Sequence, residues 1–274
     1  MTRTVLLTGA AGSIGAALRR ELRGVYPVLR LVDIKPIGDL APGEEFHRVD
    51  IADFAAVEKA MAGVDAVVHM AGQSVEADWE TVKRQNIEGL YNVYEAARRA
   101  GVKRVVYPSS NHAVGFYPRN RRVGARVVFR PDGLYGVSKA FGELVAALYA
   151  DKHGVGSLCI RIGNANDKPI DKRRLSIWIS WRDLAQLVRI GIEHPDVHFE
   201  IVYGVSENDR SWFDNATAYR LGYKPKDFAE DHAAEVLARE PPEDPDAVGP
   251  RVIGGSFADD GYSGDPDRIE KFRY

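Results

Sequence analysis

The chain has 274 residues, of which 45% are hydrophobic and 28% are charged, so it can bury a full globular core. Its formal net charge of -2 gives no overall cationic field for nucleic acid or an anionic membrane, and no apolar run reaches the ~20 residues that span a bilayer. We therefore expect neither a nucleic-acid partner nor a membrane span. The N-terminus enters a strand pattern directly, without a signal-peptide layout, which predicts a cytoplasmic protein.

The first element is a short β-rich run at residues 4–8, which leads into a glycine-rich turn and then a helical segment at residues 16–22. This order forms a phosphate cradle, because glycines let the backbone approach a pyrophosphate and the helix N-terminus meets its charge. The spacing is G-x-x-G-x-x-G, so we predict this mode of binding and not the G-x-G-x-x-G pattern of many dehydrogenases. The predicted cofactor contacts in the turn are Gly9, Gly12, Ser13, Ile14 and Gly15.

Asp33 ends a second predicted strand, at residues 28–33, about 20 residues beyond the glycines. An aspartate at this offset accepts hydrogen bonds from both hydroxyls of the adenosine ribose and repels a 2′-phosphate, so it favours NAD over NADP. An acid that merely begins a turn is the alternative interpretation. A third strand is predicted at residues 46–51, where Asp50 or Ile51 would contact the adenine edge.

A continuous apolar run at residues 64–72 predicts a fourth strand that is buried on both faces of a parallel sheet. The small residues at its end, Ala71 and Gly72, leave room for a cofactor. A long helix is expected at residues 79–100 and a fifth strand at residues 102–110. Strands and helices therefore alternate, which is typical of an α/β fold with a doubly wound parallel sheet of the Rossmann type.

The second half of the chain continues the pattern with three predicted elements: a strand at residues 158–164, a helix at 181–193 and a strand at 199–204. Residues 241–274 are rich in proline, aspartate and glycine, so we expect irregular surface structure or an arm packed on a neighbouring subunit. We expect residues 1–163 to form an NAD-binding Rossmann core. Residues 164–274 would form a small substrate-binding portion and a C-terminal arm, interleaved with that core.

Tyr135 and Lys139 lie four residues apart at the start of a predicted helix, so both side chains would project from one face. An ammonium held close to a phenol stabilises the phenolate, so we expect Lys139 to lower the pKa of Tyr135 and make it a base near neutral pH. Taken alone, such a pair is more often a surface tyrosine beside a solvated lysine. A serine at the end of the fifth strand could bind the same substrate hydroxyl, and we choose Ser110 with Ser109 in reserve.

Other residues are candidates from their place in the chain. Asn86 could hold this helix or a water near Lys139, and a helix-surface amide is the equal alternative. His112 lacks an obvious carboxylate partner in sequence, so we interpret it as a hydrogen-bonding group for substrate. Arg173 lies in a basic run that is either a solvated loop or a bidentate clamp for an anionic substrate group. The single cysteine, Cys159, lies in an apolar run, which predicts no disulfide and no metal site.

Three stretches together resemble the extended short-chain dehydrogenase/reductases, and among them the uronate dehydrogenase family. They are Thr-Gly-Ala-Ala-Gly-Ser-Ile-Gly at residues 8–15, Ser-Ser-Asn-His at 109–112 and Tyr-Gly-Val-Ser-Lys at 135–139. The resemblance extends over nearly the whole chain through further stretches at residues 73–76, 130–133, 161–163, 176–178, 212–215 and 254–257. Members of this family oxidise C1 of a cyclic hexuronic acid with NAD and give an aldarolactone.

The resemblance implies roles for individual residues. Tyr135 would be the base, and Lys139 would also bind the nicotinamide ribose. Arg173 would hold the uronate carboxylate. Sugar hydroxyls would be contacted by Ser74, Ser110, Asn111 and His112. We further assign Ile162 to the cofactor side of the site and Asn164 to the substrate side.

The sequence thus predicts an NAD-dependent 1-dehydrogenase of D-glucuronate or D-galacturonate that forms a homo-oligomer. Asn164 stands where the family pattern has a serine, in a more basic loop, which leaves open the same reaction on a hexose with a 6-phosphate or 6-sulfonate. A nucleotide-sugar epimerase or dehydratase, which recycles its NAD, usually has a larger C-terminal substrate domain. A non-catalytic NAD-sensing protein is disfavoured by the intact Ser, Tyr and Lys set.

Overall fold

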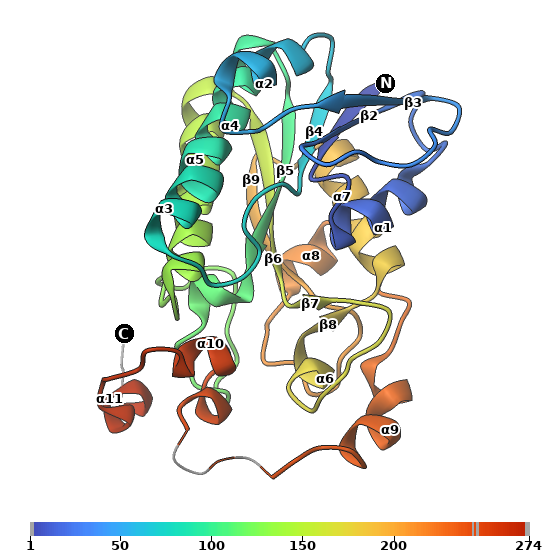
Figure 1. Cartoon of the computed structure of the whole chain (residues 1–274). Coiled ribbons are helices and arrows are strands. Elements are labelled where there is room, and N and C mark those ends of the chain that lie inside the picture. Colours follow the sequence, from blue (N-terminus) through green and yellow to red (C-terminus); the bar gives the residue numbers. More distant parts are fainter. Residues whose placement is uncertain (1–2, 243, 245–246, 272–274) are drawn as a thin grey trace.

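The computed structural model describes residues 3–242, 244 and 247–271. Its centre is a seven-stranded parallel sheet in the order β3-β2-β1-β4-β5-β6-β9 (Figure 1). The strand order reverses between β1 and β4, and ligands bind such sheets beyond the carboxyl ends of the strands at this switch point. The strands are β1 (Thr4–Thr8), β2 (Val28–Asp33), β3 (Glu44–Arg48), β4 (Ala66–His69), β5 (Arg104–Ser110), β6 (Gly156–Ile162) and β9 (Phe199–Gly204).

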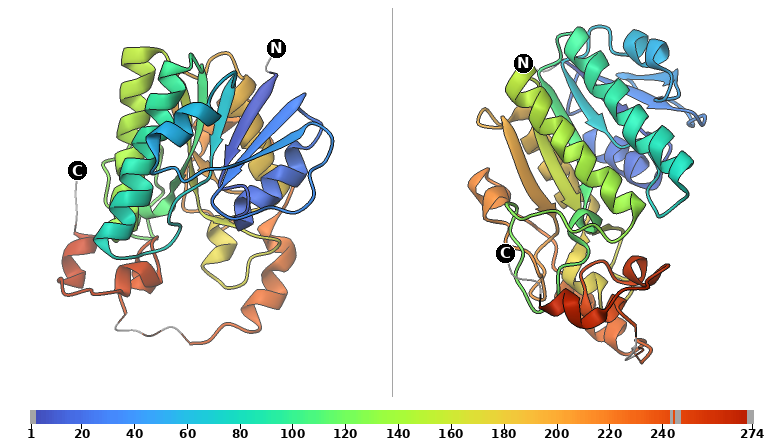
Figure 2. Two further views of the ribbon diagram at one scale, coloured as in Figure 1. Left: turned by 45° about the horizontal axis from the view of Figure 1, so that its top comes forward. Right: turned by 90° about the vertical axis from the view of Figure 1, so that its left-hand side faces the viewer.

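Helices cover both faces of the sheet (Figure 2). On one face α1 (Ser13–Leu22) packs against α7 (Trp181–Glu193), and on the other α4 (Gly89–Arg99) lies between α2 (Phe54–Ala60) and α5 (Leu134–His153). Successive strand residues point to opposite faces, so Leu7 joins the core under α1 and Leu6 joins the core under α4. The predicted doubly wound α/β fold is confirmed.

Four predicted strands have different bounds in the structure. The fourth and fifth, expected at residues 64–72 and 102–110, occupy 66–69 and 104–110. The third strand was expected at residues 46–51 but occupies 44–48, because it pairs with β2 only as far as Asp33, which faces Arg48. The sixth strand ends at Ile162, and Asn164 belongs to a separate short pair, β7 (Asn164–Ala165) with β8 (Trp178–Ile179).

The long helix expected at residues 79–100 consists of three consecutive parts. α3 (Trp79–Val82) is followed by a π-helical segment, η1 (Lys83–Glu88), and then by α4. A π-helical turn inserts an extra residue and changes which side chains face inward. In this turn Asn86 is buried, at 5% exposure, so the alternative of a helix-surface amide is wrong.

Beyond β6 the chain adds α7 to one face of the sheet and β9 to its edge, and otherwise forms the short β7 and β8 pair, short helices and loops (Figure 1). After residue 241 the described part consists of short helical turns and irregular stretches, as expected, but it does not all lie at the surface: Val252 is buried in an apolar cluster, and the Asp259 carboxylate accepts from the amides of Val248 and Gly249. Residues 243, 245–246 and 272–274 lie outside the described part. The remaining helical segments are η2 (Asn111–Val114), α6 (Arg174–Ile177), α8 (Ala216–Arg220), η3 (Ala229–His232), α9 (Ala233–Leu237), η4 (Gly249–Arg251), α10 (Ser256–Asp259) and α11 (Pro266–Glu270).

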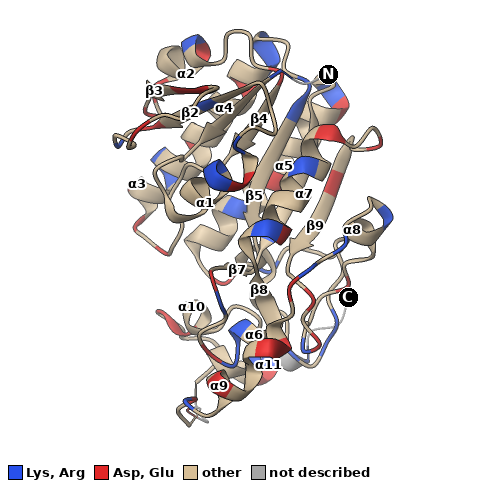
Figure 3. Cartoon of the chain, turned by 90° about the vertical axis from the view of Figure 1, so that its right-hand side faces the viewer, with Lys and Arg blue, Asp and Glu red and all other residues tan. Residues whose placement is uncertain are grey.

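Charged residues of both signs are interspersed along the helices, strands and loops (Figure 3). None of the described helices is long and apolar enough to cross a membrane. Within the same described residues, no group of three or more His, Cys, Asp or Glu side chains is placed to hold a metal ion.

Candidate active site

The turn between β1 and α1 lies directly against the end of β4. Gly9 has a φ of +69°, and a Cβ there would lie 2.6 Å from the Ala71 amide nitrogen. Gly15 packs against the Gly9 carbonyl so closely that a Cβ would overlap it. Both positions therefore require glycine, and the turn leaves the α1 N-terminus open to a phosphate.

Thr8 holds the backbone that follows β4. Its Oγ1 accepts hydrogen bonds from the amides of Met70 (3.0 Å) and Ala71 (3.1 Å) and lies 2.8 Å from His69 Nδ1. Since the hydroxyl already accepts twice, it donates its proton to Nδ1, which assigns the neutral His69 tautomer with hydrogen on Nε2. Burial, together with the charge of Lys139, lowers the pKa of His69 to about 3, so the ring stays neutral.

Two cavities meet at this backbone, at Met70, Ala71 and Gly72. The smaller, of about 250 Å³, is lined by the predicted cofactor residues Gly9, Gly12, Asp33, Asp50 and Ile51. The larger, of about 540 Å³, is lined by the predicted residues Ile14, Ser74, Ser110, His112, Tyr135, Lys139, Ile162, Asn164 and Arg173. Four predicted site residues line neither cavity: Ser13, Gly15, Asn86 and Asn111.

The two joined cavities suit an elongated dinucleotide with its adenosine half in the smaller one. Asp33 lies there with one carboxylate oxygen accepting from the Ala11 amide (2.9 Å) and the other from the Lys35 amide (2.9 Å). A carboxylate oxygen has further lone pairs for a ribose hydroxyl. Asp50 is paired with Arg84 at 2.6 Å, and this hydrogen bond lowers the pKa of Asp50.

Replacing Asp33 by asparagine should lower the preference for NAD over NADP by about 10- to 100-fold, because the like-charge repulsion of a 2′-phosphate is removed. Asparagine keeps an oxygen for the Ala11 amide, so the glycine turn is preserved. The measurement is the ratio of kcat/KM for the two cofactors. An unchanged ratio would show that Asp33 does not select the cofactor.

Tyr135 and Ser110 meet at the centre of the larger cavity. Burial raises the pKa of Tyr135 to about 12, which the Ser110 hydrogen bond opposes and the Asp132 charge increases. The expectation that Lys139 lowers the pKa of Tyr135 is therefore wrong. The physical reason is that the free-energy cost of removing a phenolate from water exceeds the stabilisation that one neighbouring hydroxyl gives it.

Lys139 lies beneath the tyrosine and faces two aromatic rings. Its Nζ is 5.4 Å from the ring centroids of both Tyr135 and Tyr107 and donates to the Pro108 carbonyl oxygen at 2.9 Å. Burial lowers the pKa of Lys139 to about 8. The ammonium is thus held in place and can give up its proton within reach of neutral pH.

The shifted pKa of Lys139 predicts a pH-dependent stability. Above about pH 8 the folded protein holds Lys139 neutral, whereas the unfolded chain stays protonated up to its ordinary value of 10.5. The unfolded state then binds more protons, so stability rises with pH in this window and falls as pH drops through 8. Relative to Lys139→Met, the unfolding free energy of the wild type without cofactor should rise by roughly 2–3 kcal/mol from pH 7 to 10. Urea denaturation of both proteins measures this difference, and parallel pH curves would contradict it.

His112 has a carboxylate partner that the sequence did not reveal. Its Nδ1 lies 2.7 Å from Oδ2 of the buried Asp132, and its ring stacks on Phe257 with centroids 4.1 Å apart. This partner could not be recognised in the sequence because it lies 20 residues away, and the role of His112 as a hydrogen-bonding group for substrate stays a prediction. The pairing leaves Nε2 as the ring nitrogen for a ligand in the cavity, and Phe257 comes from the C-terminal segment, which thus forms one wall of the site.

Arg173 is a partly buried cation that lines the larger cavity. Its Nε donates to the Ile253 carbonyl oxygen (2.9 Å), and among the described residues it forms no ion pair. Burial, with the charges of Arg119 and Arg174, lowers the pKa of Arg173 to about 10, so it remains charged at neutral pH. A desolvated guanidinium of this kind favours an anionic ligand group.

Asn111 supports this arginine from below the cavity and is fully buried. With its amide oriented to satisfy its hydrogen bonds, the oxygen accepts from Arg173 Nη2 (3.1 Å) and the nitrogen donates to the Ile162 carbonyl oxygen (3.1 Å). The structure therefore places Asn111 behind Arg173, whereas the resemblance implied a direct contact with a sugar hydroxyl.

Two residues fix the N-terminus of α5. The Glu76 carboxylate accepts from the amides of Leu134 (2.8 Å) and Tyr135 (3.0 Å), where an acid also complements the helix dipole. Asn86 donates to Ser138 Oγ (3.0 Å) and exchanges two hydrogen bonds with the Gln73 backbone. Sequence reasoning gave Glu76 no role, since no local spacing links it to a helix that begins so far along the chain.

The chain is similar to proteins of known function over most of its length. A family model described as the NAD dependent epimerase/dehydratase family matches residues 5–206. A uronate dehydrogenase from Pseudomonas putida is 46% identical over 93% of this chain and 95% of its own length. An NAD-dependent glucose-6-phosphate dehydrogenase from Haloferax volcanii is 39% identical over 83% of this chain and 94% of its own. The crystal structure of a mutant uronate dehydrogenase from Agrobacterium tumefaciens complexed with NAD has 42% identity and a TM-score of 0.91, covering 94% of this chain and 98% of that one.

Proposed function

The chain belongs to the NAD dependent epimerase/dehydratase family, and from this we infer that it is an NAD-dependent uronate dehydrogenase. It oxidises C1 of a cyclic hexuronate, D-glucuronate or D-galacturonate, to the aldarolactone. The observation that supports this best is the partly buried Arg173 guanidinium in the same cavity as the Ser110, Tyr135 and Lys139 side chains. One end of the cavity thus suits a carboxylate and the other suits oxidation of a hydroxyl.

The residues around Tyr135 carry the proton chemistry. Ser110 orients the C1 hydroxyl, and Tyr135 takes its proton as general base. NAD, when bound in the joined cavities, supplies the hydride acceptor and a positive charge that favours the Tyr135 phenolate. Taking the proton of the C1 hydroxyl makes Tyr135 a neutral phenol, and Lys139, whose lowered pKa lets it be neutral, accepts the proton from Tyr135 and so restores the base. His112, oriented by Asp132, hydrogen-bonds a sugar hydroxyl through Nε2.

The substrate end of the cavity uses Arg173 to bind the C6 carboxylate bidentately. Asn164 lines the same cavity, and its Oδ1 is buried without a hydrogen-bond partner among the described residues. A buried acceptor of this kind needs a donor, and a sugar hydroxyl can supply one. We propose that residues 164–274 mainly bind substrate, with residues 1–163 mainly binding NAD.

A second candidate is the same oxidation on a hexose with a 6-phosphate. It is favoured by the likeness to a glucose-6-phosphate dehydrogenase and by Arg119 and Arg174, whose charges act on Arg173. Initial rates of NADH formation with D-glucuronate, D-galacturonate, D-glucose 6-phosphate and a 6-sulfo hexose separate the candidates. Rapid turnover of a uronate supports the first, and turnover of the phosphorylated sugar alone selects the second.

We further propose that the enzyme is a cytoplasmic homo-oligomer. The cytoplasm holds the NAD that the reaction consumes. The outer side of α5 and α4 exposes large apolar side chains, and an unpaired apolar face of this kind suits a second copy of the chain. These are Leu134, Val137, Leu144, Leu148 and Tyr91. Light scattering of the wild type and of Leu144→Glu, Leu148→Glu tests this, and a monomeric wild type would refute it.

A further inference from the structure

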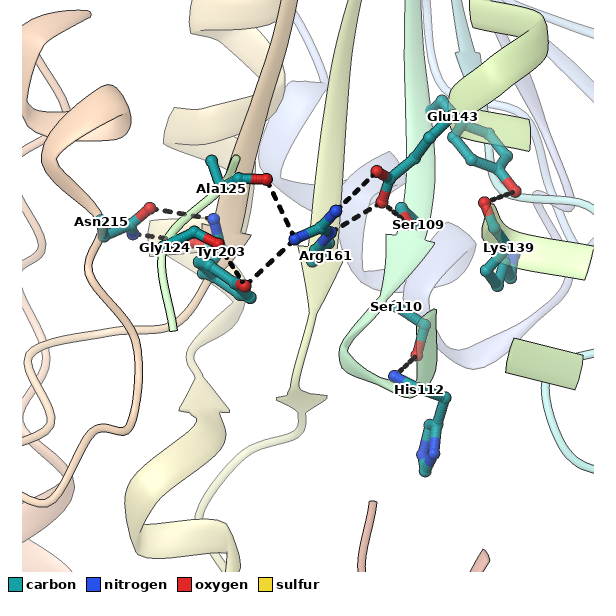
Figure 4. Close-up of polar contacts among 11 residues, drawn as sticks. Ser109, Ser110, His112, Gly124, Ala125, Lys139, Glu143, Arg161, Tyr203 and Asn215 are labelled. Carbon is teal, nitrogen blue, oxygen red and sulfur yellow. Dashed lines mark hydrogen bonds and ion pairs between the residues drawn. The ribbon is translucent and has the colours of Figure 1, made fainter. Parts of the chain in front are cut away.

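A buried ion pair joins β6 to α5 beside Ser109 (Figure 4). Arg161 on β6 and Glu143 on α5 have side chains that are 0% and 1% exposed, and they form two parallel hydrogen bonds of 2.9 Å. Neither residue lines either cavity. A buried pair adds little net stability, because the cost of desolvating both charges offsets their attraction. Stability alone therefore does not account for it.

The remaining hydrogen bonds of Arg161 join two more parts of the fold, β9 and the loop at residues 124–125 (Figure 4). Its Nη1 donates to the hydroxyl of Tyr203 on β9 (3.1 Å) and to the carbonyl oxygen of Ala125 (3.3 Å). The Tyr203 hydroxyl in turn donates to the Gly124 carbonyl oxygen (3.0 Å). The planar guanidinium is thus fixed in one orientation, and it fixes the Glu143 carboxylate.

Glu143 completes a series of contacts between α5 and the end of β5. On the helix, Tyr135, Lys139 and Glu143 follow one another at four-residue steps and so share one face. On the strand, the Pro108 carbonyl oxygen accepts from Lys139 and the Ser109 hydroxyl donates to Glu143, while Ser110 lines the same cavity as Tyr135. Consecutive residues at the end of β5 are therefore tied to successive turns of the helix.

We propose that Glu143 and Arg161 are positioning residues that set α5 against β5, so that Ser110 meets Tyr135 and Lys139 in reactive geometry. The proposal rests on the proposed function for what that geometry catalyses. Because the pair touches neither cavity, its loss should act on kcat and leave the binding of both substrates nearly unchanged. It also explains why Ser109 is unsuited to the reserve role, since its hydroxyl is committed to Glu143.

The test compares three purified proteins with the wild type. Ser109→Ala removes the contact between the strand and Glu143 and leaves the ion pair intact. Glu143→Leu combined with Arg161→Met removes both charges, so that no unpaired charge stays buried. The matched control is Arg19→Met with Glu44→Leu, which removes a bidentate pair between α1 and β3 with side chains 14% and 1% exposed. The readouts are kcat, both KM values, NADH binding and amide hydrogen exchange of residues 134–143.

Ser109→Ala and the double variant should each lose about 10- to 100-fold in kcat, with KM values within about threefold of the wild type and faster exchange in residues 134–143. The control should keep its kcat. A kcat within about twofold of the wild type in Ser109→Ala or in a folded double variant would overturn the proposal, as would an equal loss in the control. If the double variant does not fold, Ser109→Ala decides. If the wild type oxidises none of the sugars, the proposed function is wrong. The amide hydrogen exchange of residues 134–143 in the variants then still tests whether Glu143 and Arg161 hold α5 against β5.

Discussion

Tyr135→Phe should reduce kcat by about 10²–10⁴-fold, the usual contribution of a general base. Phenylalanine keeps the ring that lies beside His112 and Phe257, so the crevice retains its shape. Only the hydroxyl that Ser110 contacts is lost. The affinity for NADH should stay within about threefold of the wild type, because no binding contact of the adenosine half is changed. Steady-state kinetics and NADH fluorescence titration measure the two quantities.

The matched control for this prediction is Tyr149→Phe on the same helix. Its hydroxyl donates to Glu95 at 3.1 Å, outside both cavities. This variant should keep its kcat and lose only stability. Equal losses of turnover in the two variants, or a parallel loss of NADH binding in Tyr135→Phe, would assign Tyr135 a structural role instead of a chemical one.

Arg173→Met should lower kcat/KM for D-glucuronate by about 10²–10³-fold, as expected when one partner of a desolvated charge pair is removed. The loss comes from leaving the C6 carboxylate without its guanidinium in a buried site. Methionine has a volume similar to that of arginine. It does not donate the hydrogen bonds that the Asn111 amide oxygen and the Ile253 carbonyl oxygen accept from Arg173, so the thermal stability of the variant must be measured as well.

Neutral D-glucose serves as the internal control for Arg173, because it has no carboxylate at C6. The ratio of kcat/KM for D-glucuronate over D-glucose should fall by nearly the whole loss that Arg173→Met causes. If both sugars lose activity equally, Arg173 shapes the cavity and does not recognise the carboxylate.

Much of the cofactor half could be predicted because its signals are local in the chain. Glycines at fixed spacing between a strand and a helix indicate a close approach of two backbone segments, as is seen at Gly9. The acid at the end of the next strand lies beside this turn, where the Asp33 carboxylate accepts a hydrogen bond from the Ala11 amide. Tyr135 and Lys139 share one helix, so their four-residue spacing alone placed them together. Strand ends were less predictable, since β3 stops where its pairing with β2 stops.

Partners that are distant in sequence could not be predicted from spacing. His112 meets Asp132 only because the loop between them folds back, and Glu143 meets Arg161 only because β6 lies beside β5. The direction of the Tyr135 pKa shift was also wrong, because a pattern of residue types does not show how deeply the phenol is buried. The C-terminal segment gave no periodic signal, yet Phe257 stacks on His112 inside the cavity.

The central claim, that the crevice oxidises C1 of a uronate with NAD, is tested most directly with D-glucuronate deuterated at C1. Mass spectrometry of the NADH formed should show the deuterium transferred to the cofactor, in step with the appearance of the lactone. Unlabelled NADH, or no NADH from this sugar, would contradict the account.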